Sequence, residues 1–131
     1  MSDHNQIIRH INIIYNLNIR YNKMVQEIKT LADFATSIGD KNTGLVVIDF
    51  FADWCGPCKM IAPKFNKLSE KYPNISCCKI NSDNQEMKEA CEACNISSLP
   101  TFCFFRGGKY IAKMTGANAE NLEKLMVQHS N

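Results

Sequence analysis

The sequence predicts an α/β fold in which one mixed β-sheet carries helices on both faces. Segments with strand character alternate with segments whose apolar residues recur at helical spacing, as expected of parallel strands joined by helices. The continuous apolar run at 45–52 predicts a central strand that is covered on both faces. Gly107 and Gly108, between two apolar runs, predict a hairpin that adds antiparallel strands to the sheet.

The elements before the central strand are short. Residues 24–28 predict a strand. Thr30 predicts the N-cap of a helix that ends near Gly39, because its side chain can accept a hydrogen bond from the first helical turn. After the central strand, apolar residues at helical spacing predict a helix over 58–72. The remaining predictions are a strand at 75–80, a short helix at 86–94, hairpin strands at 101–105 and 110–114, and a closing helix at 119–128.

Residues 1–23 differ in composition from the rest of the chain. They are rich in Ile and Asn, poor in acidic residues, and place Ile7, Ile11 and Ile14 at helical spacing. A mitochondrial transit peptide would fit, but Asn and β-branched Ile are weak helix formers, and an unstructured extension fits as well. We expect an extension at 1–23, disordered or a leader, followed by one domain at 24–131.

Length, composition and charge exclude several classes of protein. The 131 residues suit one domain, and 45% hydrophobic with 21% charged residues is typical of a soluble globular chain. The formal net charge of +2 comes from Arg9, Arg20 and Lys23 against Asp3, so the remainder is neutral, with 12 basic and 12 acidic side chains. A neutral body argues against a nucleic-acid partner. The chain also lacks the apolar run of a membrane span or secretory signal, so we expect no membrane partner.

The cysteine pattern indicates a reducing compartment. Seven cysteines are an odd number, and Cys77 and Cys78 are adjacent, whereas secreted disulfide frameworks usually have an even count at regular spacings. We therefore expect a cytoplasmic protein whose cysteines do not form structural disulfides.

One cysteine pair falls where the central strand gives way to the next helix. The unpaired N–H groups and positive dipole end of a helix N-terminus favour the thiolate, which makes Cys55 the candidate nucleophile. Cys58 is three residues further on, near enough to form a disulfide with it, while Gly56 and Pro57 fix the turn between them. A C-x-x-C pair alone can equally be half of a zinc site.

The longer string around this pair resembles a known signature. Residues 49–59, DFFADWCGPCK, resemble the active site of the thioredoxin family. The resemblance covers about residues 24–128 and continues at Lys79, Leu99-Pro100-Thr101, Gly107-Gly108 and Gly116-Ala117. It implies the thioredoxin fold and an enzyme that reduces protein disulfides by dithiol-disulfide exchange. It also implies a redox-active disulfide between Cys55 and Cys58 and no bound cofactor.

The resemblance further implies roles for single residues. Pro100 would be a cis-proline facing the disulfide, and Leu99 would offer backbone groups to a bound substrate strand. The implied substrate-binding surface consists of Trp54, Gly56, Pro57, Leu99, Pro100, Gly116 and Ala117.

Asp49 lies in the middle of a predicted buried strand, where an unpaired carboxylate is costly and its pKa should rise. The resemblance implies that Asp49 accepts the proton of Cys58 through a water, with Lys79 as its charge partner. The alternative is a structural carboxylate that is satisfied by hydrogen bonds.

The resemblance also implies partners. These are an NADPH-dependent thioredoxin reductase and clients of the peroxiredoxin, ribonucleotide reductase and methionine sulfoxide reductase types. The implied setting is electron transport and redox homeostasis in the cytoplasm, or in mitochondria if residues 1–23 are a transit peptide, and we expect a monomer. An isomerase or oxidase is the alternative enzyme, but Gly-Pro between the cysteines favours a reductant. The alternative to an enzyme is a binding module without catalytic activity, and the intact cysteine pair argues against it.

Cys91 and Cys94 form a second C-x-x-C pair. With the first pair, 32 residues away, it could hold zinc, but that spacer is longer than in the usual ribbons, so we expect no metal. Cys94 stands where some animal thioredoxins carry a regulatory cysteine, which makes Cys91 and Cys94 candidates for a regulatory disulfide. Buried inert thiols are the alternative. Cys77, Cys78 and Cys103 are predicted to be small core residues.

Overall fold

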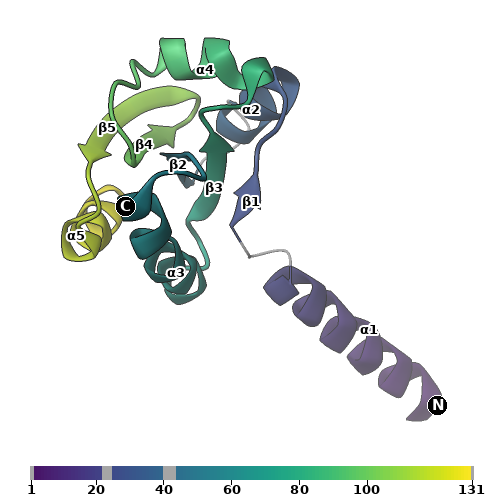
Figure 1. The fold of residues 1–131 in the computed structure, drawn as a ribbon. Coiled ribbons are helices and arrows are strands. Elements are labelled where there is room, and N and C mark those ends of the chain that lie inside the picture. Colours follow the sequence, from purple (N-terminus) through teal and green to yellow (C-terminus); the bar gives the residue numbers. More distant parts are fainter. Residues whose placement is uncertain (1, 22–24, 40–43, 131) are drawn as a thin grey trace.

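A computed structural model describes residues 2–21, 25–39 and 44–130 (Figure 1). In chain order the elements are α1 (Ser2–Tyr21), β1 (Gln26–Glu27), α2 (Leu31–Ile38), β2 (Leu45–Phe51), α3 (Gly56–Lys71), β3 (Ser76–Asn81), the 3₁₀ turn η1 (Gln85–Met87), α4 (Lys88–Ala93), β4 (Thr101–Arg106), β5 (Lys109–Thr115) and α5 (Ala119–His129). The alternation of strands and helices predicted from the sequence is confirmed.

The strands form one mixed sheet in the order β1-β3-β2-β4-β5. Strands β1, β3 and β2 run parallel, whereas β4 is antiparallel to β2 and forms the predicted hairpin with β5. Strand β2 therefore has a hydrogen-bonded neighbour on each side. At its centre, Asp49 is in register with Lys79 of β3 and Phe102 of β4.

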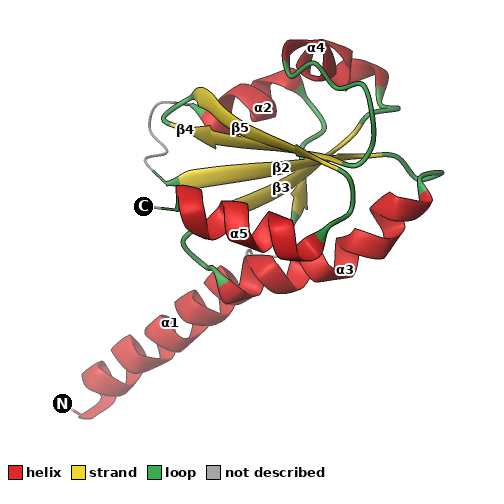
Figure 2. Cartoon of the chain, turned by 90° about the vertical axis from the view of Figure 1, so that its left-hand side faces the viewer, coloured by secondary structure: helices red, strands yellow, loops and turns green. Residues whose placement is uncertain are grey.

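Helices cover both faces of this sheet, α2 and α4 on one and α3 and α5 on the other (Figure 2). Successive side chains of β2 alternate between the two layers, as the pleat of a strand requires. Leu45 and Val47 belong to the core beneath α3 and α5, and Val46, Ile48 and Phe50 to the core on the other face. Each such fully buried side chain stabilises the fold by about 1.5–3 kcal/mol. Burial on both faces fixes β2 as the centre of the molecule.

The ends of the elements differ slightly from the predicted ones. Thr30 is the N-cap of α2, and its hydroxyl accepts a hydrogen bond from the Asp33 N–H at 3.1 Å, as predicted. Helix α3 begins at Gly56, two residues earlier than its apolar series, because Cys55 acts as its N-cap. Strand β1 has only two residues, and the predicted helix at 86–94 starts with the η1 turn.

The N-terminal extension contains a long helix. Helix α1 projects away from the sheet and its covering helices in both views (Figures 1 and 2). This differs from the unstructured alternative. Residues 2–21 contain neither Gly nor Pro, and their apolar residues recur at helical spacing, which outweighs the weak propensities of Asn and Ile. None of the helices in the described ranges is long and apolar enough to cross a membrane.

We predict that removal of residues 1–23 leaves disulfide reduction and the melting temperature nearly unchanged, because α1 contributes no strand to the sheet and no residue to the cysteine pair. The measurement compares thermal melts and insulin reduction for the full chain and for residues 24–131. A large drop in melting temperature would show instead that α1 packs on the domain.

Candidate active site

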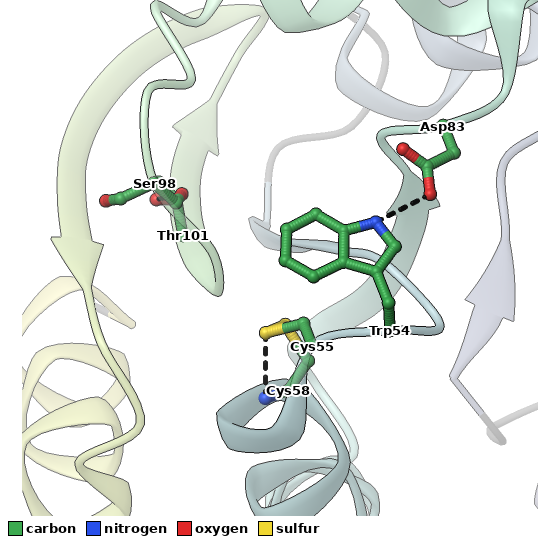
Figure 3. Close-up of a disulfide and its surroundings, with 6 residues drawn as sticks. All are labelled: Trp54, Cys55, Cys58, Asp83, Ser98 and Thr101. Carbon is green, nitrogen blue, oxygen red and sulfur yellow. Dashed lines mark hydrogen bonds between the residues drawn. A yellow bond between two sulfur atoms is a disulfide. The ribbon is translucent and has the colours of Figure 1, made fainter.

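The cysteine pair lies where β2 ends and α3 begins. The Cys55 N–H donates to the Ala52 carbonyl at 3.1 Å, which closes the turn between the two elements. The Cys55 sulfur in turn accepts a hydrogen bond from the Cys58 N–H at 3.2 Å, so the sulfur itself caps the helix (Figure 3). Cys55 and Cys58 form a disulfide, with their Cα atoms 5.2 Å apart. The predicted pairing of the two cysteines is confirmed.

This position favours negative charge on Cys55 once the disulfide is reduced. The sulfur faces the positive end of a 16-residue helix and already accepts one of its free N–H groups. Pro57 occupies the first turn of α3, where its missing N–H costs no helical hydrogen bond. Gly56 and Pro57 are exposed, whereas both sulfur-bearing residues are buried.

Trp54 is an exposed aromatic side chain held in place beside the disulfide. Its side chain is 71% exposed, yet the indole Nε1 donates to Oδ2 of Asp83 at 2.9 Å (Figure 3). Asp83 is fixed by its own N–H, which donates to Oδ1 of Asn81 at 3.0 Å. Asp83 is a site residue that was not predicted from the sequence. It could have been found from the parallel pairing of β2 with β3, which places Phe51 opposite Asn81 and the loops after both strands at one edge.

Leu99 and Pro100 belong to the loop before β4, whose flanking residues Ser98 and Thr101 lie across the disulfide from Trp54 (Figure 3). The peptide bond between Leu99 and Pro100 is cis, as predicted. Leu99 packs against the small cluster that contains both cysteines, and the Pro100 carbonyl accepts a hydrogen bond from the Gly116 N–H at 2.9 Å. Gly116 is exposed with a φ of +94°, a conformation that favours glycine, and Ala117 is half-buried against the core. These predicted residues therefore come together from two loops.

Asp49 is buried in the centre of β2. Its side chain is 4% exposed, and among the residues that the structure describes, Oδ1 has no hydrogen-bond partner. Burial raises the pKa of Asp49 from 3.8 to about 7, although the positive charge of Lys79 opposes the shift. The sequence-based expectation of a raised pKa is confirmed. A carboxyl group that titrates near neutral pH can both accept and release a proton under physiological conditions.

A cleft of about 300 Å³ extends between β2, β3 and the start of α3. Asp49, Cys58 and Lys79 all line it, together with Phe51, Ala52, Asp53, Lys59 and Ala62. Lys79 extends over the Phe51 ring, with its Nζ 5.4 Å from the ring centroid. The cleft is lined in part by polar groups, and its volume is large enough to hold water.

Sequence and structure comparisons agree with this geometry. A sequence model of the thioredoxin family matches residues 24–128. The chain belongs to the thioredoxin family. It is 53% identical over 106 residues to the thioredoxin-like protein R548 of Acanthamoeba polyphaga mimivirus, covering 81% of this chain and 77% of that protein. It is 40% identical over 100 residues to the thioredoxin of Equus caballus, covering 76% of this chain and 93% of that one.

Solved thioredoxin structures share the fold. The crystal structure of Fasciola hepatica thioredoxin aligns with a TM-score of 0.75 and 36% identity, covering 81% of this chain and all of that one. Malassezia sympodialis thioredoxin aligns with a TM-score of 0.75 and 37% identity, covering 82% and 91%. With Cys55 and Cys58 paired, this thioredoxin-family protein is a thiol-disulfide oxidoreductase that acts on protein disulfides.

The other five cysteines of this thioredoxin-family protein are free thiols. Cys77 and Cys78 in β3 and Cys103 in β4 are buried, as predicted for core residues. The Cys94 thiol hydrogen-bonds to Cys103, whose sulfur lies 3.4 Å from the Tyr110 hydroxyl. No group of metal-ligating side chains is found within the described part of the chain.

Two causes make the second C-x-x-C pair less reactive than a typical thiol. The hydrogen bond to Cys103, followed by burial, raises the pKa of Cys94, and burial raises that of Cys91. A raised pKa leaves little thiolate at neutral pH, and the thiolate is the form that oxidants attack. The regulatory disulfide between Cys91 and Cys94 stays a prediction.

We predict that peroxide oxidises Cys55 and Cys58 first, because Cys55 alone among these thiols caps a long helix. Only higher doses should join Cys91 to Cys94 and weaken turnover by the reductase. Peptide mass spectrometry after a peroxide titration measures both events. Cys91 and Cys94 that remain free at every dose, or a disulfide from Cys94 to Cys103, would contradict the regulatory pair.

Proposed function

We propose that this protein is an electron donor that reduces disulfides in client proteins, with Cys55 as the attacking thiol and Cys58 as the resolving thiol. The observation that carries the assignment is the position of the Cys55 sulfur as the N-cap of α3, next to exposed Trp54, Gly56 and Pro57. Cys58 instead faces the cleft that contains Asp49. One sulfur is therefore placed for attack and the other for proton transfer.

The proposed reaction has two exchange steps. The Cys55 thiolate attacks a client disulfide, forming a mixed disulfide and releasing one client thiolate. Asp49 then takes the Cys58 proton through a water in the cleft, and the Cys58 thiolate attacks Cys55 and releases the second client thiolate. Two electrons pass to the client, which takes up two protons, and the protein is left with the Cys55–Cys58 disulfide. Lys79 limits how far the pKa of Asp49 rises, so the carboxyl group can be ionised when Cys58 must lose its proton.

The docking surface that we propose for clients surrounds the disulfide. Trp54 lies on one side, and Ser98 and Thr101, which flank Leu99 and Pro100, lie on the other. Leu99 packs on the cysteine cluster, and the Pro100 carbonyl accepts a hydrogen bond from the Gly116 N–H. Ala117, Gly56 and Pro57 complete the surface. Trp54 and Pro57 provide its exposed apolar area, Leu99 and Ala117 are half-buried, and Pro100 is buried. Exposed apolar surface next to a reactive sulfur suits contact with many unrelated proteins.

We further propose the direction, partners and location of this chemistry. Gly-Pro between the cysteines favours a reductant over an oxidase or isomerase. An NADPH-dependent thioredoxin reductase would regenerate the dithiol, and clients would be of the peroxiredoxin, ribonucleotide reductase and methionine sulfoxide reductase types. We propose a monomer in the cytoplasm, or in mitochondria if residues 1–23 act as a transit peptide. N-terminal sequencing of the protein from its natural source distinguishes the two locations.

Single cysteine variants test the two roles. Cys55→Ser should abolish insulin reduction with dithiothreitol, because it removes the attacking thiolate. Cys58→Ser should accumulate client adducts that dithiothreitol releases, because attack still occurs and resolution does not. Cys91→Ser, a half-buried thiol outside the site, is the matched control and should keep full activity. Activity in Cys55→Ser, or no adducts with Cys58→Ser, would refute the assigned roles.

Replacement of Asp49 should separate stability from activity. The folded carboxyl group holds its proton more tightly than the unfolded one, so its ionisation destabilises the fold as pH rises from 3.8 to about 7. Asp49→Ala should therefore raise the free energy of unfolding by about 1–3 kcal/mol at neutral pH and above, and by less in acid. Urea melts of the oxidised protein across pH measure this.

The same variant should resolve mixed disulfides about tenfold or more slowly near neutral pH, because Cys58 loses its proton acceptor. The defect should shrink at high pH, where hydroxide deprotonates Cys58 directly. Asp49→Asn, which keeps the size of the side chain, is the control for the cavity. A variant that is both less stable and fully active would show that Asp49 is a structural carboxylate.

A further inference from the structure

Helix α1 carries an apolar face that is open to solvent. The five isoleucines Ile7, Ile8, Ile11, Ile13 and Ile14 are each between 44% and 58% exposed. The helix points away from the sheet in both views (Figures 1 and 2), so the domain does not cover these side chains. Five exposed isoleucines within eight residues are expected to bind something.

The two sides of α1 differ in chemistry. At about 100° per residue, Ile7, Ile11 and Ile14 lie along one line of the helix, with Ile8 about 100° from Ile7 on one side. Ile13 lies about 120° from Ile7 on the other side, towards the polar side of the helix. Asn5, Arg9 and Asn12 lie on the opposite side by the same spacing. The helix is therefore amphipathic, with an apolar face made of Ile7, Ile8, Ile11 and Ile14. The polar residues Asp3, Gln6 and His10 lie beside Ile7 and Ile11 at one edge of this face.

Charge points to the nature of the partner. Residues 1–23 contain all of the chain's excess positive charge, and Asp3 is their only acidic residue. The rest of the chain is neutral. A positively charged amphipathic helix of low mean hydropathy is typical of segments that lie in the interface of an anionic membrane.

The same features argue against a second copy of this helix as the partner. A two-helix seam would cover the line of Ile7, Ile11 and Ile14 and would leave Ile8 and Ile13 exposed on its two flanks. Two identical helices would also bring like charges together, with only Asp3 to balance them. A lipid surface can cover Ile8 together with that line, and it adds opposite charge.

We propose that α1 lies in the plane of an anionic phospholipid surface, with its isoleucine face in the acyl boundary, and so holds the redox domain at a membrane. The sequence-based expectation of no membrane partner considered spanning segments and secretory signals, and an interfacial helix needs neither. Attachment by a single interfacial helix is reversible, because only a few apolar side chains and charges contribute. The proposed membrane contact does not depend on the direction of the redox reaction.

Vesicle sedimentation of the full chain tests this proposal. The protein should sediment with vesicles that contain phosphatidylserine and much less with vesicles of phosphatidylcholine alone, and added salt should weaken the binding. The double variant Ile7→Gln with Ile11→Gln should bind about tenfold or more weakly, because two side chains leave the apolar boundary. Arg9→Gln should weaken binding to the anionic vesicles alone.

The matched control is Asn5→Gln with Asn12→Gln on the opposite side of α1. It changes the same number of residues to the same good helix former, so it should bind vesicles as the native chain does. Insulin reduction in solution should be equal for all of these proteins, which shows that each domain is folded.

Three results would overturn the proposal. The first is sedimentation that is absent or equal for both double variants. The second is a dimer in light scattering that the isoleucine variant abolishes, which would identify a second copy as the partner of α1. The third is a protein from the natural source that lacks residues 1–23, which would identify a leader that is removed.

Discussion

The structure depends on the burial of β2 on both faces and along both edges. Neighbours β3 and β4 satisfy its backbone, and the two layers of helices cover its side chains, so the strand cannot shift without opening both cores. Because β2 is fixed, the turn at its end is fixed as well. Cys55 therefore meets the N-terminus of α3 in one orientation, and the chemistry of the site needs no metal or cofactor to position the sulfur.

The burial of the Asp49 carboxylate costs free energy, and its position along β2 determines which side of the sheet it faces. Burial removes the hydration of the Asp49 carboxylate, and the positive charge of Lys79 on β3 offsets only part of the free energy that this costs. The alternation of side chains along β2 points Asp49 to the same face as Leu45 and Val47, where α3 begins with the cysteine pair. A position one residue earlier or later would have directed the carboxylate to the opposite core, away from Cys58.

Local sequence patterns predicted most of the fold, but they did not predict contacts between residues that are far apart in the sequence. The central apolar run, the Thr30 cap and the Gly107-Gly108 hairpin each depend on a few neighbouring residues, and all three are found in the structure. The contact of Trp54 with Asp83 and that of Cys94 with Cys103 join separate elements, and no local pattern encodes either. The sequence does not decide between a helix and an unstructured segment for α1. Its residues have weak helix propensities, whereas the spacing of its apolar residues favours a helix.

The hydrogen bond from Trp54 to Asp83 has a consequence for the thermodynamics of the client docking that we propose. An exposed indole ordinarily samples several rotamers and loses that freedom when a partner covers it, which weakens binding. Here the ring is already held at its nitrogen, so most of that conformational entropy is lost on folding rather than on contact. A preorganised aromatic surface of this kind can bind many unrelated sequences weakly and release them quickly, because the association requires little ordering of the protein itself.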